Sequence, residues 1–111
     1  MALGHVVEMD RDIFSGLIKL HILYHASKEK VFGLWIIQEL RRHGYELSPG
    51  TLYPILHRLE KRGYLSSEKE VVKGKVRRVY FITTPGMEMF LKARGKVKEL
   101  FGELFEDNES S

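Results

Sequence analysis

The segment SPGTLYPILHRLEKRGYL, from Ser48 to Leu65, carries the strongest structural pattern in this chain. Ser48 is placed to cap a helix, and Pro49 occupies the first helical position, where no amide hydrogen is needed. Apolar residues then recur at i, i+3, i+4 and i+7, as Leu52, Ile55, Leu56 and Leu59. Gly63 ends the pattern, as a residue free to adopt the left-handed conformation commonly does. The segment predicts an amphipathic helix with one buried stripe.

The opposite side of this helix carries hydroxyl, imidazole and cationic groups. These groups can donate hydrogen bonds to phosphates and to base edges. The predicted nucleic-acid contacts are Ser48, Thr51, Tyr53, His57, Arg58 and Lys61.

A basic hairpin is predicted directly after this helix. Leu65 to Val72 and Lys75 to Thr83 have strand-like composition, and Lys73-Gly74 supplies the turn between them. Its basic residues are predicted to contact phosphates: Lys73, Lys75, Arg77 and Arg78.

Two helices are predicted before this unit and one after it. The first spans Asp10 to Ala26, with Asp10 or Asp12 as its cap, and its two apolar stripes predict cover on more than one side. A polar connection, 27–31, leads to a helix from Phe32 to His43, which Gly44 ends. Thr84-Pro85 opens the last helix, which extends to about Phe105.

Three helices followed by a hairpin and a further helix make a winged helix-turn-helix, in which the third helix enters the DNA major groove. The predicted fold class is mainly α with a small β-hairpin, an α+β fold. The predicted divisions are a winged helix-turn-helix over 10–83, a C-terminal dimerisation helix over 84–106 in the same compact unit, and a flexible tail over 107–111.

The positive charge is concentrated in the middle of the chain. The formal net charge is +3, yet residues 41–78 hold ten basic and four acidic residues, whereas the flanking segments are net negative. Such clustering is typical of a polyanion-binding surface, and a solvated basic face is the alternative.

Ser48 to Leu65 resembles the recognition-helix signature of the PadR-like transcriptional regulators. GKVRRVYFITTPG, Gly74 to Gly86, is similar to that family's wing, and Gly33-Leu34-Trp35-Ile36 lies where the family has a glycine-aromatic-x-isoleucine motif. Leu34 stands in place of the usual tyrosine. The short single C-terminal helix resembles the smaller subfamily. This resemblance implies a homodimeric repressor, often one that a small aromatic or cationic compound releases from DNA.

The last helix independently predicts dimerisation. Its apolar residues follow a 3-4 spacing interrupted by Arg94, a coiled-coil-like seam. The predicted contacts are Met87, Phe90, Leu91, Val97, Phe101 and Leu104. Two-fold symmetry would then require a near-palindromic double-stranded DNA operator. The alternative is that the helix folds back on its own domain.

The expected effector site is built from aromatic rings on helices that meet at the dimer interface, namely Phe14, Trp35 and Phe90. His21 and His25 could bind a metal, but the sequence offers no evident third ligand, so we expect a histidine pair in a core or interface, with no metal and no cofactor.

Enzymatic activity is not predicted, because the chain has no Walker-type loop, nucleophile elbow or cysteine. The chain has no apolar run of about 18 residues and no secretory leader, so we expect no membrane contact and a cytoplasmic location. A winged-helix module that binds a protein partner remains the alternative function, which salt-dependent DNA binding would distinguish.

Overall fold

The segment from Ser48 to Leu65 forms the predicted amphipathic helix. The computed structural model describes residues 11–106, and in it helix α4 spans Pro49–Lys61. Its stripe of four apolar residues is buried, and Gly63 follows with a φ of +85°. Ser48 occupies the cap position, but its side chain makes no capping hydrogen bond to the backbone and instead donates to Thr51 Oγ1 at 3.3 Å. The cap geometry is therefore confirmed and its expected side-chain bond is not.

The two preceding helices share one hydrophobic core with α4. Helix α2 spans Arg11–Lys28, and α3 spans Gly33–Arg42, followed by Gly44 with a φ of +88°. Asp10, one of the two predicted caps, and the predicted flexible tail, 107–111, lie outside the described residues. Within this single chain one stripe of α2 is covered, because Ile18 and Ile22 are buried, whereas Ile13 and Leu17 of the other stripe are exposed.

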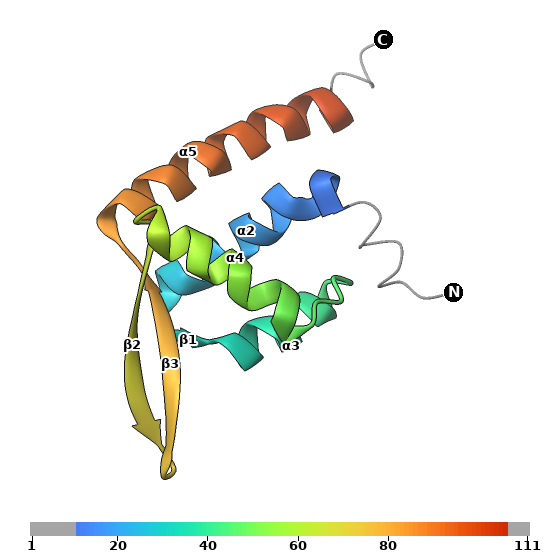
Figure 1. Ribbon diagram of the computed structural model, residues 1–111. Helices are drawn as coiled ribbons and strands as arrows, with labels where there is room; N and C mark the ends of the chain where they lie inside the picture. Colours follow the sequence, from blue (N-terminus) through green and yellow to red (C-terminus); the bar gives the residue numbers. More distant parts are fainter. Residues whose placement is uncertain (1–10, 107–111) are drawn as a thin grey trace.

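A small sheet carries the wing, which projects from the helices in Figure 1. Strands β2 (Leu65–Val72) and β3 (Lys75–Ile82) form an antiparallel hairpin that turns at Lys73 and Gly74, whose φ angles are both positive. That pattern fits the tight hairpin turn predicted from Lys73-Gly74. The sequence did not predict β1 (Val31–Phe32), which replaces the end of the expected polar connection and pairs with β3.

Helix α5 spans Thr84–Phe101 and continues as one π-helical turn, Gly102–Glu106. The residue that caps it is Thr83 rather than Thr84, because Thr83 Oγ1 accepts a hydrogen bond from the Gly86 amide at 3.0 Å. The same hydroxyl donates to the Gly63 carbonyl, and the Thr83 amide donates to the Tyr64 carbonyl at 3.2 Å. The start of α5 is thus bonded to the turn that ends α4.

One hydrophobic core joins these elements. Its most deeply buried side chains come from α2, α3, α4 and β2, and include Ile18, Ile22, Leu40, Leu52, Leu56 and Leu65. Helix α5 adds Phe90 and then runs on past α2, as Figure 1 shows. Among residues 11–106, no helix is both long and apolar enough to cross a membrane.

Candidate nucleic-acid interface

The outer face of α4 is polar and accessible. His57, Arg58 and Lys61 are exposed, opposite the buried stripe of the same helix, and Ser48 is exposed at its start. Thr51 is half-buried. Because the apolar side of α4 is fully used by the core, these donors are held outward by a rigid helix, which suits the reading of a DNA groove.

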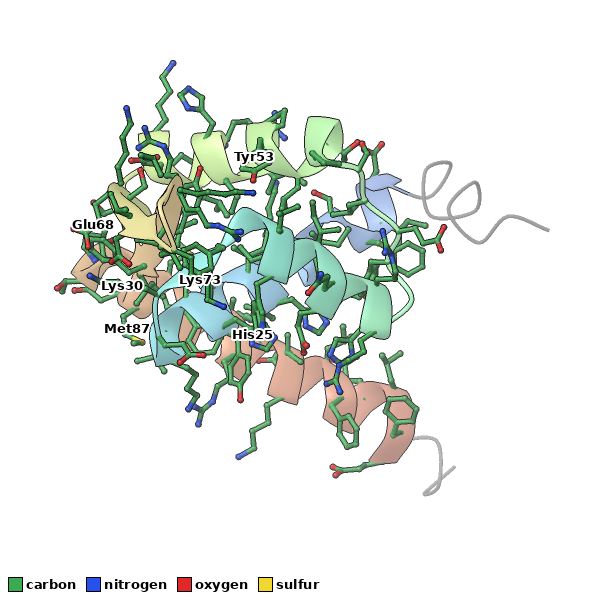
Figure 2. All side chains as sticks on the ribbon, turned by 90° about the horizontal axis from the view of Figure 1, so that it is seen from below. His25, Lys30, Tyr53, Glu68, Lys73 and Met87 are labelled. Carbon is green, nitrogen blue, oxygen red and sulfur yellow. The ribbon has the colours of Figure 1, made fainter. Side chains whose placement is uncertain are left out.

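Tyr53 is placed differently from the other predicted contacts. Its side chain is 40% exposed, but its ring turns toward the start of α3 and lies against Gly33, as Figure 2 shows for its position between the two helices. A Cβ at residue 33 would lie 2.7 Å from Tyr53 Cζ, too close for any side chain there without a shift. Gly33 therefore makes room for the ring.

The wing has two different faces, which the strand register defines. Residues directly opposite each other in an antiparallel pair project to the same side. The helix-side face begins with Leu65 and Tyr80, which are in the core, and continues outward through Lys69 opposite Arg78. The back face carries Glu68, Glu70, Arg77 and Lys75.

The four predicted wing contacts are thus divided. Arg78 lies on the helix-side face, where it donates to Ser67 Oγ at 3.0 Å, and Ser67 donates to Glu60 of α4 at 2.8 Å. Arg77 lies on the back face with its guanidinium 5.5 Å from the centre of the Phe32 ring, and Lys75 alternates to the same side. Lys73 is exposed at the tip.

Lys30 closes the back face. Its ammonium bonds both Glu68 and Glu70, at 3.3 Å for the latter, and lies 5.8 Å from the centre of the Phe81 ring. Figure 2 shows Lys30 and Glu68 side by side. The hydrogen bonds to Glu68 and then Glu70 raise the pKa of Lys30 above its ordinary value. The acidic residues of the wing are therefore paired on the side away from α4.

The described surface is divided between two sides of the molecule. In Figure 2, α4 lies at one edge and the C-terminal part of α5 at the opposite edge, with α2 and α3 between them. The α5 side is apolar, with exposed Val97, Phe101 and Leu104 beside Leu91, and Met87 is half-buried. Exposed Ile13, Leu17 and Tyr24 of α2 extend this surface. One side thus offers hydrogen-bond donors and cations, the other a hydrophobic surface.

A pocket of about 600 Å³ lies between α2, α3 and α5. Phe90 is the one predicted ligand residue that lines it, together with Tyr24, His21 and Arg94. Phe14 instead packs edge-on against Tyr45 with ring centres 6.0 Å apart. Trp35 packs edge-on against His25, 5.1 Å away, and does not line the pocket. The three predicted residues do not converge within one chain.

Two histidines lie beside Glu39 of α3 at this pocket, His25 from α2 and His43 directly after α3. His25 Nε2 and His43 Nε2 lie 3.5 and 3.2 Å from Glu39 Oε2, and the Arg42 Nε lies 3.2 Å from Glu39 Oε1. Partial burial opposes ionisation of Glu39, but the hydrogen bond with His43 and the charge of Arg42 hold its pKa below the ordinary value. Burial, followed by the charge of His43, lowers the pKa of His21.

These histidines do not form a metal centre in the described residues. The His21 and His43 rings stack with centres 4.7 Å apart. Within residues 11–106, no three histidine, aspartate or glutamate side chains have an arrangement that could hold a metal ion. The sequence pointed to His21 and His25 by their spacing, but Glu39 and His43 carry no such signal because they lie in α3 and directly after it.

The comparisons with known proteins agree on one family. Residues 22–92 match the family model described as Transcriptional regulator PadR-like family. Transcriptional regulator Rv3488 of Mycobacterium tuberculosis is 49% identical over 94 residues, which span 85% of this chain and 88% of that protein.

Two solved structures are similar throughout the fold. The crystal structure of smu.1704 from Streptococcus mutans UA159 has a TM-score of 0.78 at 30% identity, covering 84% of this chain and 87% of that chain. A PadR-like transcription factor from Bacteroides fragilis has a TM-score of 0.75 at 28% identity, covering 94% of this chain and 99% of that one.

Proposed function

Because this chain belongs to the PadR-like family of transcriptional regulators, and is a DNA-binding regulator rather than an enzyme, we propose that it represses transcription as a homodimer on a near-palindromic operator. Repression follows the implication of the family resemblance. A cytoplasmic location follows from the proposed target, since double-stranded DNA must be accessible to the protein.

The observation that carries this proposal is the shared side of α4 and the wing. His57, Arg58 and Lys61 project from α4, and Arg78 is bonded through Ser67 to Glu60 of the same helix. The wing and α4 therefore present cations on the same side of the molecule. In the proposed complex α4 enters the major groove and reads bases, while the wing cations contact phosphates without reading sequence.

The proposed dimer uses the opposite side of the molecule. The exposed apolar residues of α5 and the outer stripe of α2 belong to neighbouring helices, because α2 and α5 contact each other. Burial of such a surface against a second copy is favourable in proportion to the apolar area removed from water. A two-fold axis there would place the two α4 helices on one side, about 34–36 Å apart, one turn of DNA.

The decisive experiment measures binding of the full chain to a labelled fragment from the promoter of its own gene, over a series of salt concentrations. Phosphate contacts release counterions, so the affinity should fall steeply as salt rises. A reporter fused to the same promoter should then lose expression when the protein is supplied. Binding that is equally weak for the promoter and for unrelated DNA, with little salt dependence, would favour the protein-partner alternative.

We further propose that a small aromatic effector weakens DNA binding. The support for it is the pocket lined by Tyr24 and Phe90 on the two helices of the proposed dimer surface. An effector can shift the dimer between two spacings only by its differential affinity for them. Trp35 is the sole tryptophan and contacts His25 of the pocket wall, so its emission should report binding. Phenolic acids and planar cationic dyes form the panel, and a panel without quenching or loss of DNA binding would favour a constitutive repressor.

A further inference from the structure

Two valines near the tip of the wing remain unexplained by the phosphate-contact proposal. Val71 and Val76 are directly opposite each other in the hairpin, and their side chains are 73% and 66% exposed. By register they belong to the helix-side face, two residues beyond Lys69 and Arg78. The helix-side face thus ends in an apolar pair.

The surroundings of this pair fit a polyanion. Lys69 and Arg78 form the next cross-strand pair inward, and Lys73 stands at the turn. Within the hairpin, 65–82, the carboxylates of Glu68 and Glu70 both lie on the back face, where Lys30 binds them. Two apolar side chains bordered by cations, with the acids turned away, complement the sugar and phosphate lining of a DNA groove.

The reach of the wing fits the groove next to the one that α4 would occupy. Ser67 is hydrogen-bonded to Glu60 of α4, and Val71 lies four strand residues further out, which is about 13 Å at ~3.3 Å per residue. The major groove is about 12 Å wide and the minor groove about 6 Å. The valine pair therefore lies far enough from α4 to pass one phosphate backbone and meet the adjacent minor groove.

We propose that Val71 and Val76 form an apolar wedge that enters this minor groove and packs on its deoxyribose walls, with Lys69 and Arg78 on the bordering phosphates. The inference rests on the proposed DNA-binding function. It adds a position of the operator that α4 does not touch. The guanine 2-amino group projects into the minor groove and is absent from A·T pairs, so the wedge should prefer A·T pairs there.

A cross-strand valine pair also stabilises a hairpin, and the test must separate the two effects. Threonine keeps the β-branched shape and strand preference of valine while replacing a methyl group by a hydroxyl. The test variant is Val71→Thr/Val76→Thr. The matched control is Val72→Thr, the same change one residue along, on the back face.

The DNA probes are derived from the operator mapped on the promoter fragment, with the flanking pairs changed to A·T, G·C or inosine·C. Inosine·C keeps the major-groove donors and acceptors of G·C but lacks the 2-amino group in the minor groove. The parent protein should bind the A·T and inosine·C probes alike and about tenfold more tightly than the G·C probe. The double variant should lose this preference while keeping the parent's salt slope, because no phosphate contact is removed. Val72→Thr should behave as the parent.

Other results overturn the inference in distinguishable ways. Equal affinity of parent and double variant for all three probes, with Arg58→Ala still weakening binding, would reject the wedge and leave the proposed function intact. Full DNA binding by the double variant with loss of repression in the reporter would assign the valines to a protein partner. If the double variant melts at a lower temperature than the parent, its weaker binding could come from a less stable hairpin. Hydroxyl-radical footprints of the parent then test the wedge directly, because valines in the minor groove must protect the sugars of the flanking base pairs. If the parent binds no promoter DNA, the proposed function itself fails.

Discussion

The hydroxyl end of the Tyr53 ring, on α4, fills the space that a Cβ would take at Gly33, the first residue of α3. The contact sets how closely the start of α3 approaches the recognition helix. It also holds the Tyr53 hydroxyl toward α3, so the ring supports the outer face of α4 while remaining 40% exposed.

Gly33→Ala should lower the free energy of unfolding by about 1–2 kcal/mol, because the added methyl group overlaps the ring and forces it to move. Urea unfolding measures this loss. The change should be nearly neutral in a Tyr53→Leu background, where the overlapping atoms are absent, so the two substitutions should be strongly non-additive. Additive effects would show that the contact is unimportant.

Arg58→Ala and His57→Ala should each weaken operator binding by about 1–3 kcal/mol and change the sequence preference at one position. Both side chains project outward from α4, away from its buried stripe. Lys92→Gln, on α5, is the control and should leave binding unchanged. Operator affinity equal to that of the parent in both alanine variants would show that this face does not meet DNA.

Lys73→Asn should weaken binding to all sequences alike and reduce the slope of log affinity against log salt by about 1. Asparagine is chosen because Lys73 has a φ of +51°, a conformation that asparagine tolerates. The turn is thereby kept while the charge is removed. An altered sequence preference with an unchanged salt slope would contradict a phosphate contact.

Phe101→Glu should convert a dimer into monomers or aggregates, since it introduces a charge into the exposed apolar surface of α5. Lys92→Glu is the matched control, nine residues earlier and thus about 180° around the helix. Sedimentation at micromolar concentration measures both. A parent protein that sediments as a monodisperse monomer would end the dimer proposal.

Acidification below about pH 6.5 should destabilise the fold through His21 and His25. Burial lowers the pKa of both side chains below the ordinary 6.5, and the charge of Glu39 opposes this shift. The charge of His43 lowers both pKa values further, and that of Arg42 lowers the pKa of His25. The unfolded chain then binds protons that the folded chain does not, so the free energy of unfolding falls as pH drops through that window. Melting temperatures from pH 7.5 to 5.5 test this, and His21→Asn/His25→Gln should flatten the dependence. If the melting temperature of that variant depends on pH as steeply as that of the parent, these histidines are not the cause of the pH dependence.

The elements set by local chemistry were predictable from the sequence. Pro49, Gly63 and the Lys73-Gly74 turn fix their own backbone conformations, so α4 and the hairpin appear at nearly the expected residues. Strand β1 was missed because two residues carry no periodicity, and its existence depends on the neighbouring β3.

The faces of the candidate site were harder to predict than its elements. Arg77 and Arg78 are neighbours in one basic cluster, yet the strand register sends them to opposite sides. Lys30 was not singled out because its partners lie about forty residues away in the wing. Pairings of this kind arise only when distant segments pack, and composition does not encode them.

The hydrogen bonds of Thr83 connect the end of α4 to the start of α5. Its hydroxyl bonds both Gly63, at the end of α4, and Gly86, in the first turn of α5, while a Cβ at residue 86 would collide with the Tyr64 backbone. The end of α4 is therefore held against the start of α5. Helix α5 is about 27 Å long. A tilt of α5 by about 5° about its start displaces its far end by about 2 Å. A small rotation at the junction of α4 and α5 therefore changes the position of the far end of α5.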